Sequence, residues 1–146
     1  MRVLVQRVRR ARVSVAGEEV GAIGAGLALL VGVHVDDGEA EMRFCADKCA
    51  HLRIMGDDEG LMNRSVLDVG GQVLAVSQFT LYGDCRKGRR PGFTDAARPE
   101  VAEPLYDSFC RHLEGLGLTV QRGSFGAHML VEIDNDGPVT LMVESP

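Results

Sequence analysis

The feature that most constrains the fold is an apolar run from Leu27 to Val35, which follows the break Gly24-Ala25-Gly26. A half-buried strand alternates apolar and polar residues, whereas a strand that is buried on both faces is apolar throughout. The run therefore predicts a central strand, and this strand predicts the core of a sheet.

The N-terminal segment predicts the neighbours of this strand. We expect strands over residues 2–8 and 11–15, joined at the step Arg9-Arg10. In the second of them, small apolar residues alternate with Arg12 and Ser14 at the two-residue period of a half-buried strand. A turn at residues 16–18 then leads into a short strand over residues 20–23.

Two segments have the pattern of helices. Asp36 is expected to cap the first, with Glu39 completing a capping box, and the helix is expected to run to about Met55, where Gly56 stops it. The second begins at Pro99 and ends at Gly115 and Gly117. Its apolar side chains fall on one face that must pack on the sheet, namely Ala102, Leu105, Tyr106, Phe109 and Leu113.

The remaining segments predict further strands. A turn over residues 57–60 precedes a strand over residues 72–82, and residues 83–98 form a polar loop without a period. Strands follow at 118–122, 128–133 and 139–143, the last two separated by a tight turn at residues 135–138. We expect one domain over residues 1–146, an α/β chain of the α+β type with a barrel-like sheet of mostly antiparallel strands and two packed helices.

Charge and composition exclude several function classes. The net charge of −5 argues against a protein that coats nucleic acid through a broadly basic surface, although recognition of a nucleic-acid end remains open. With no Trp and 5% aromatic residues, base-stacking platforms are not expected. Charges in the first 15 residues exclude the apolar core of a signal peptide, so a cytoplasmic protein is expected.

Standard catalytic and metal motifs are nearly absent. The four histidines are scattered, and no serine-nucleophile, zinc-protease or phosphate-loop motif occurs. Cys45, Cys49 and His51 lie close enough for a partial zinc site, but buried free thiols are the simpler interpretation. We expect no cofactor and no metal.

Three features stand out, each with a purely structural alternative. The strand over 72–82 becomes polar near its end; alternation would place Gln78 and Thr80 on one face, where they could meet a ligand or simply solvent. Residues 135–140 read as a turn. Arginine fills 14 of the 16 basic positions and forms two clusters, at residues 7–12 and 86–90. Each cluster is interpreted either as a phosphate-binding site or as solvated surface.

Taken together, these features resemble the D-aminoacyl-tRNA deacylase family, also described as D-tyrosyl-tRNA(Tyr) deacylases. The motifs occur in family order over nearly the whole chain: QRV at 6–8, GAGLALLVGV at 24–33, MN at 62–63, VSQFTLYGD at 76–84, KGRRPGF at 87–93 and NDGPVT at 135–140.

The resemblance implies three groups of site residues. It places Ser77, Gln78, Phe79 and Thr80 at the catalytic pocket. It implies a chirality-selecting dipeptide with a cis bond, Gly137 and Pro138, which enters the pocket of a partner subunit and is braced by Arg7. The stretch with Phe125, Ala127 and Met129 is similar to the site for the terminal adenosine, with His128 where an acidic residue is common.

The implied reaction is hydrolysis of the ester bond of D-aminoacyl-tRNA, and of glycyl-tRNA formed on tRNA(Ala), by a homodimer that binds the 3′ acceptor end. The resemblance implies that backbone N–H groups around Phe79 and Thr80 bind the carbonyl and that the tRNA 2′-hydroxyl assists the attacking water. Thr80 as a covalent nucleophile is the competing mechanism. The alternative function is a nucleic-acid-binding module without turnover.

Overall fold

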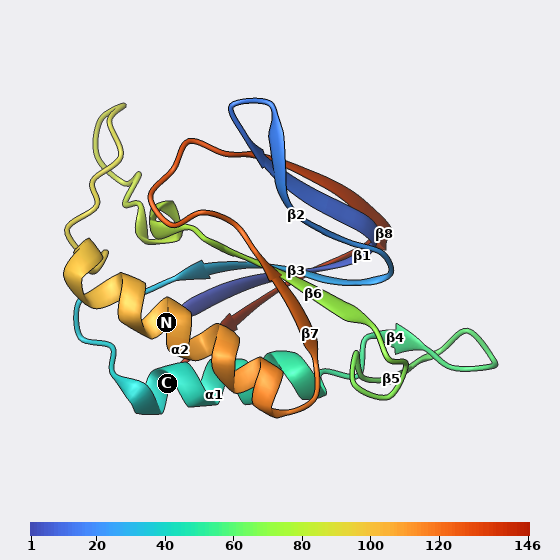
Figure 1. Cartoon of the computed structure of the whole chain (residues 1–146). Helices are drawn as coiled ribbons and strands as arrows, with labels where there is room; N and C mark the ends of the chain where they lie inside the picture. The colour runs from blue at the N-terminus through green and yellow to red at the C-terminus, as the bar shows by residue number, and fades with distance from the viewer.

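A computed structural model describes all residues from 1 to 146, folded as one sheet with two helices (Figure 1). The helices are α1 (Glu39–His51) and α2 (Pro99–Gly115), and a short 3₁₀ helix, η1, spans Phe79–Tyr82. The strands are β1 (Arg2–Val15), β2 (Glu18–Ile23), β3 (Gly26–Gly32), β4 (Met55–Gly56), β5 (Met62–Arg64), β6 (Gln72–Ser77), β7 (Thr119–Arg122) and β8 (Leu130–Glu144).

The main sheet is mixed and nearly closed. Its order is β2-β1-β3-β6-β7, and β8 pairs with β1. The three pairs that involve β1 are antiparallel, whereas β3–β6 and β6–β7 are parallel. At the closing edge, a Cβ on Gly21 of β2 would lie 2.8 Å from the carbonyl oxygen of Arg122 in β7. The expected α+β fold with a barrel-like, mostly antiparallel sheet is confirmed.

Apolar side chains fill both faces of the sheet. The larger core of 25 buried residues lies between the sheet and the two helices, which Figure 1 shows on the same side. A smaller core of seven residues, including Val8, Leu74 and Val76, fills the concave side. No helix is long and apolar enough to cross a membrane.

The central strand is where the sequence predicts it. β3 lies between β1 and β6, and six of its seven residues are buried. It ends at Gly32 rather than at Val35. The two strands expected over 2–8 and 11–15 are wrong as separate elements: β1 runs through Arg9 and Arg10 without a break. The register of pairing between β1 and β8 shifts on either side of Val8, where the alternation of apolar and polar residues is interrupted.

The first helix differs from its prediction at both ends. Gly38, not Asp36, is the N-cap residue, and its N–H donates to Glu41 at 2.8 Å. The neighbouring Asp37 caps nothing in the helix; its carboxylate accepts from the His34 N–H and from the N-terminal ammonium. α1 ends at His51, and Met55 and Gly56 belong to the small β4–β5 hairpin. α2 begins at Pro99 and ends at Gly115, as predicted.

The tight turn expected at residues 135–138 is a bulge inside one strand. β8 continues from Leu130 to Glu144 along β1, in place of the two expected strands. In the register, Gln6 pairs with Thr140 and Val8 pairs with Asn135, so residues 136–139 stand opposite Arg7 alone. The turn residues thus project from an otherwise paired strand; we refer to residues 136–139 as the β8 bulge.

Candidate active site

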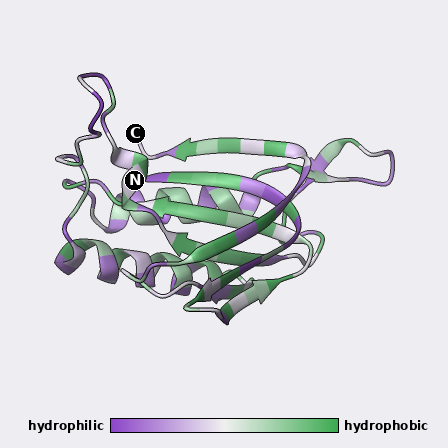
Figure 2. Cartoon of the chain, turned by 90° about the horizontal axis from the view of Figure 1, so that it is seen from above, coloured by the Kyte–Doolittle hydropathy of each residue, from purple (hydrophilic) through white to green (hydrophobic).

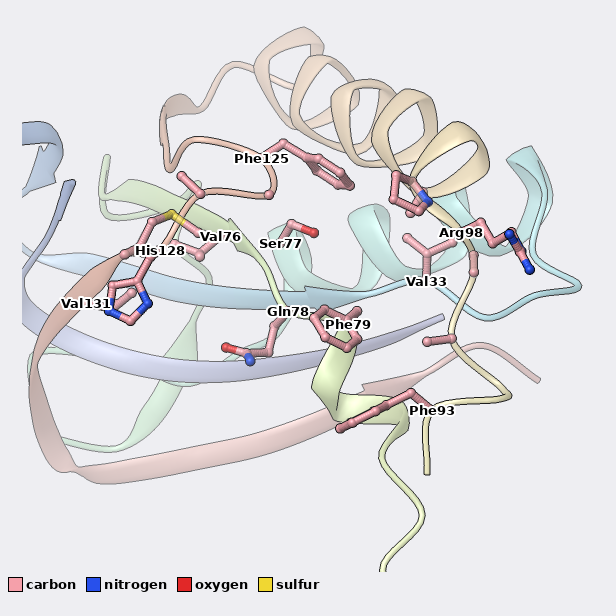
Figure 3. A pocket seen from close by; sticks show the side chains of 17 residues that line it. Val33, Val76, Ser77, Gln78, Phe79, Phe93, Arg98, Phe125, His128 and Val131 are labelled. Atoms are coloured by element: carbon pink, nitrogen blue, oxygen red, sulfur yellow. The ribbon is translucent and has the colours of Figure 1, made fainter. Parts of the chain in front are cut away.

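A cavity of about 550 Å³ opens where β6 ends (Figure 3). Its walls come mainly from residues 76–79 at the end of β6, from residues between 93 and 99 at the start of α2, and from residues 125–129 just before β8. Eleven of its 17 lining residues are hydrophobic. The cavity therefore brings together two sequence-distant segments that were predicted as site residues.

The segment predicted to be catalytic is a turn, not a strand end. β6 stops at Ser77, and η1 follows from Phe79, so the alternation expected through Tyr82 is wrong. Phe79 is 54% exposed at the cavity mouth, whereas Tyr82 is 8% exposed. The Arg2 guanidinium lies 4.6 Å from the Tyr82 ring and donates to the Leu81 carbonyl at 3.0 Å. These contacts fix η1 against β1.

This turn leaves backbone hydrogen-bond donors without a partner at the end of β6, where the cavity opens. The first N–H groups of a helix have no partner inside it, and those of Phe79 and Thr80 donate to no other backbone carbonyl. The Ser77 hydroxyl points into the cavity (Figure 3). Ser77, Gln78 and Phe79 line the cavity, whereas Thr80 does not; its exposed hydroxyl accepts a hydrogen bond from the Gln78 amide.

Phe125, Ala127 and Met129 line the opposite part of the cavity, together with His128. Phe125 packs on Tyr106 of α2, with ring centroids 6.1 Å apart. The buried Tyr106 hydroxyl donates to the Ala75 carbonyl in β6 at 2.7 Å. Burial raises the pKa of Tyr106 well above its usual range, so this hydroxyl stays protonated and holds α2 on β6.

The cavity contains few groups that can transfer a proton. Among its lining residues, only Arg98 and His128 are titratable, and no carboxylate or thiol is present. The arrangement offers backbone donors, one hydroxyl and one amide beside an apolar wall. Such a site can bind and polarise a carbonyl group, and no hydrogen bond joins its one hydroxyl, of Ser77, to its one imidazole, of His128, as a nucleophile and its base would require.

The β8 bulge is held rigidly but lies outside this cavity. Arg7 Nε donates to the Asp136 carbonyl at 3.1 Å, and Arg7 Nη1 donates to the Ile54 carbonyl at 2.8 Å. The Asn135 amide donates to the carbonyls of Arg7 and Val139. The peptide bond between Gly137 and Pro138 is cis. Neither residue, nor Arg7, lines the cavity of the same chain.

The two arginine clusters have different environments. Arginines of the N-terminal cluster pair with acidic residues on β8: Arg7 and Arg9 with Asp136, Arg10 with Asp134, and Arg12 with Glu132. Because of these ion pairs between β1 and β8, the N-terminal cluster is part of the surface of the sheet. In the second cluster only Arg86 is paired, with Asp84.

The cysteines do not form a metal site. Cys45, Cys49 and Cys110 are buried free thiols, Cys85 is exposed, and no group of three or more potential ligands is close enough to hold an ion. Burial raises the pKa of Cys45 and of Cys110 to about 11 and raises that of Cys49 further. The interpretation as buried free thiols is confirmed for Cys45, Cys49 and Cys110, but it is wrong for Cys85, which is exposed.

Sequence reasoning missed part of the cavity wall. Val33 continues the apolar run beyond β3, and Phe93 and Arg98 come from the segment that reads only as a polar loop. Val33 and Phe93 end two of the motifs that carry the resemblance, GAGLALLVGV and KGRRPGF, but neither was predicted as a site residue. No pattern marks Arg98, and the residue types of the loop show only a single aromatic residue next to a Pro-Gly step.

Comparison with known proteins gives a consistent picture. The sequence model of the family described as D-Tyr-tRNA(Tyr) deacylase matches residues 4–144. A D-aminoacyl-tRNA deacylase from Heliobacterium modesticaldum is 65% identical over 144 residues, covering 99% of this chain and 96% of the relative. A D-aminoacyl-tRNA deacylase from Brevibacillus brevis is 65% identical over 145 residues, covering 99% of this chain and 100% of the relative.

Two solved structures share the fold. A protein described as c-Myc DNA Unwinding Element Binding Protein superposes with a TM-score of 0.95 at 42% identity and covers 100% of this chain and 99% of its own. A probable eukaryotic D-amino acid tRNA deacylase has a TM-score of 0.85 at 20% identity, with 99% and 98% coverage, and supports the fold alone.

Proposed function

Since the chain belongs to the D-Tyr-tRNA(Tyr) deacylase family and is a hydrolase that acts on D-aminoacyl-tRNA, we propose that the cavity at the end of β6 is its active site. The observation that carries this proposal is the meeting of Ser77–Phe79 with Phe125–Met129 around one cavity. The first segment binds the ester, and the second binds the terminal adenosine of the tRNA.

Catalysis rests on the backbone of η1. The free N–H groups of Phe79 and Thr80 donate hydrogen bonds to the carbonyl oxygen of the ester. They stabilise the negative charge that develops on this oxygen when water attacks. The bond from the carbonyl carbon to the ribose oxygen then breaks, the ribose oxygen takes a proton, and the free amino acid leaves. The 2′-hydroxyl of the adenosine assists the water, since the cavity offers no carboxylate for that role.

Chirality is selected by exclusion. The β8 bulge presents Gly137 and Pro138 as main-chain groups to the amino end of the substrate, so that an L side chain collides with them and a D side chain points outward. Glycine has no side chain to exclude, and glycyl-tRNA formed on tRNA(Ala) is therefore also a substrate. The anchoring of the bulge by Arg7 and Asn135 supports a rigid role of this kind.

The bulge acts in the cavity of a partner subunit. Gly137 and Pro138 do not line the cavity of their own chain, which supports a closed two-fold homodimer in which each chain completes the other's site. β8 pairs on one side only and exposes Leu141 and Met142 by 42% and 44%, which supports contact with a second copy. The reaction takes place in the cytoplasm, on the 3′ acceptor end of the tRNA.

Loss of ester from D- and L-aminoacyl-tRNA tests this function. We expect rapid turnover of the D ester and of glycyl-tRNA, and no acceleration for the L ester. The second candidate is a nucleic-acid-binding module without turnover, which the solved structure described as a DNA unwinding element binding protein favours at 42% identity. Binding of tRNA without loss of either ester would support that candidate and contradict the proposed function.

A further inference from the structure

A basic loop projects beside the mouth of the cavity. Asp84 and Gly92 exchange two backbone hydrogen bonds of 2.7 and 2.9 Å, so residues 85–91 form a protruding loop. All seven residues are exposed, and no atom lies within 4 Å of the Cβ position of Gly88 at the tip. Figure 2 shows this loop as a hydrophilic arm that projects from one end of the molecule. We call residues 85–91 the basic arm.

The charge of the basic arm is largely uncompensated. It contains four basic residues and no acidic one, in a chain whose net charge is −5. The Asp84 carboxylate holds Arg86 through contacts of 2.8 Å, and this pairing lowers the pKa of Asp84 to about 2. Lys87, Arg89 and Arg90 form no ion pair, in contrast to the N-terminal arginines on β1.

The base of the arm is fixed to the cavity mouth. Phe93, next to the closing pair, meets Phe79 of η1 edge to face with ring centroids 5.2 Å apart, and both rings line the cavity (Figure 3). A Cβ on Gly83 would lie 3.1 Å from the Phe93 ring, so η1 and the arm pack closely. Arg98, which borders the cavity and forms no ion pair, is exposed and adds a further positive charge near the mouth.

We propose that Lys87, Arg89 and Arg90 of the basic arm bind phosphates of the tRNA acceptor strand immediately before the esterified adenosine. This inference rests on the proposed function, because it places the adenosine in the cavity. A nucleic-acid strand that enters the cavity must leave through its mouth, and guanidinium groups match phosphate oxygens in pairs. The negative net charge of the rest of the protein then limits contact with the tRNA to this short segment of the acceptor strand.

The test compares the salt dependence of the wild-type protein with that of the triple variant Lys87→Gln, Arg89→Gln, Arg90→Gln. Loss of three single-strand phosphate contacts makes the slope of log(kcat/KM) against log[salt] shallower by about 2 for D-aminoacyl-tRNA. Between 50 and 200 mM salt the wild type then loses roughly 20-fold more activity than the variant. The ratio of kcat/KM for the charged tRNA to that for D-aminoacyl-adenosine, which has no phosphate, falls in the variant.

The matched control is the triple variant Arg43→Gln, Lys48→Gln, Arg111→Gln on the exposed surfaces of α1 and α2. It changes the net charge equally, and its salt slope stays within about 0.5 of the wild-type slope. An unchanged slope in the arm variant, or the same change in both variants, overturns the inference. If the wild type hydrolyses neither substrate, the proposed function fails, and the Kd of uncharged tRNA in the same salt series still tests the arm.

Cys85 allows a second test without mutation. It is the only exposed cysteine, so brief alkylation at pH 8 modifies this thiol alone, as a mass spectrum verifies. Iodoacetate adds a negative charge to the arm, and iodoacetamide adds a neutral group of similar size. We expect several-fold weaker binding of uncharged tRNA after iodoacetate, with the difference lost near 1 M salt. Equal Kd values for the two products contradict the inference.

Discussion

At the scale of single residues, the proposed site relies on backbone groups and on side chains that hold the backbone in place. The structure brings residues that the resemblance implies around one cavity: Ser77, Gln78 and Phe79 line it with Phe125, Ala127 and Met129. The role of each residue stays a prediction. What residue types cannot reveal is that the N–H groups of η1 are unpaired, because this depends on where a strand ends.

Thr80 separates the two mechanisms. Thr80→Ala leaves the backbone N–H groups of η1 in place, so we expect deacylation within about tenfold of the wild-type rate. If Thr80 were the nucleophile, the alanine variant would lose activity by about a thousandfold or more while Thr80→Ser kept most of it. Single-turnover rates with D-aminoacyl-tRNA distinguish the two outcomes, and a folded, binding-competent but inactive alanine variant would contradict the backbone mechanism.

Arg7 is expected to position the β8 bulge. Its side chain is 17% exposed and donates to two backbone carbonyls, so Arg7→Gln should lower stability by about 1–3 kcal/mol and kcat by more than tenfold. The matched control is Arg9→Gln, since Arg9 pairs with the same Asp136 but is 83% exposed. We expect a change below about 1 kcal/mol for it. If Arg7→Gln and Arg9→Gln changed thermal stability and turnover to the same extent, a positioning role for Arg7 would be contradicted.

At the scale of elements, periodicity predicted the buried and the amphipathic segments well. The apolar run forms β3, and the segment with an apolar face that starts at Pro99 forms α2. Both were predictable because the apolar residues that each element buries recur at regular spacing in the sequence. Periodicity failed at β6 and at β8, where the segments of the proposed site lie. There, the chain leaves regular pairing through η1 and through the β8 bulge, and contacts distant in sequence, such as Arg2 with Leu81 and Arg7 with Asp136, stabilise the irregular backbone.

The position of η1 depends on a small residue beneath it. A Cβ on Gly32 would lie 3.1 Å from both the Gln78 carbonyl oxygen and the Leu81 Cβ, so Gly32→Ala must move η1 outward by a few tenths of an ångström. We expect kcat to fall about tenfold because the N–H groups are displaced from the ester. Gly115→Ala, in open space at the end of α2, is the control and should keep the wild-type kcat. Equal kcat values for both variants would contradict the role of η1.

At the scale of the whole molecule, the central claim is that the active site combines the cavity of one chain with the β8 bulge of its partner. The negative overall charge fits this arrangement, because the site takes only one end of a nucleic acid. Within a single chain, Gly137 and Pro138 do not line the cavity at the end of β6. Sequence reasoning alone, without the resemblance, gives no reason to expect a second chain.

Two variants that are each inactive test the claim most directly. Ala127→Trp fills the adenosine part of the cavity, and Gly137→Ala adds a methyl group to a bulge residue whose φ is +122°, with its Cβ 2.9 Å from Arg7 Nη2. After co-refolding in equal amounts, half of the dimers carry both variants, and one of the two sites in each is intact. We expect the mixture to hydrolyse D-aminoacyl-tRNA at about a quarter of the wild-type rate. A mixture as inactive as its separate components, with mixed dimers verified by mass, would contradict the shared site.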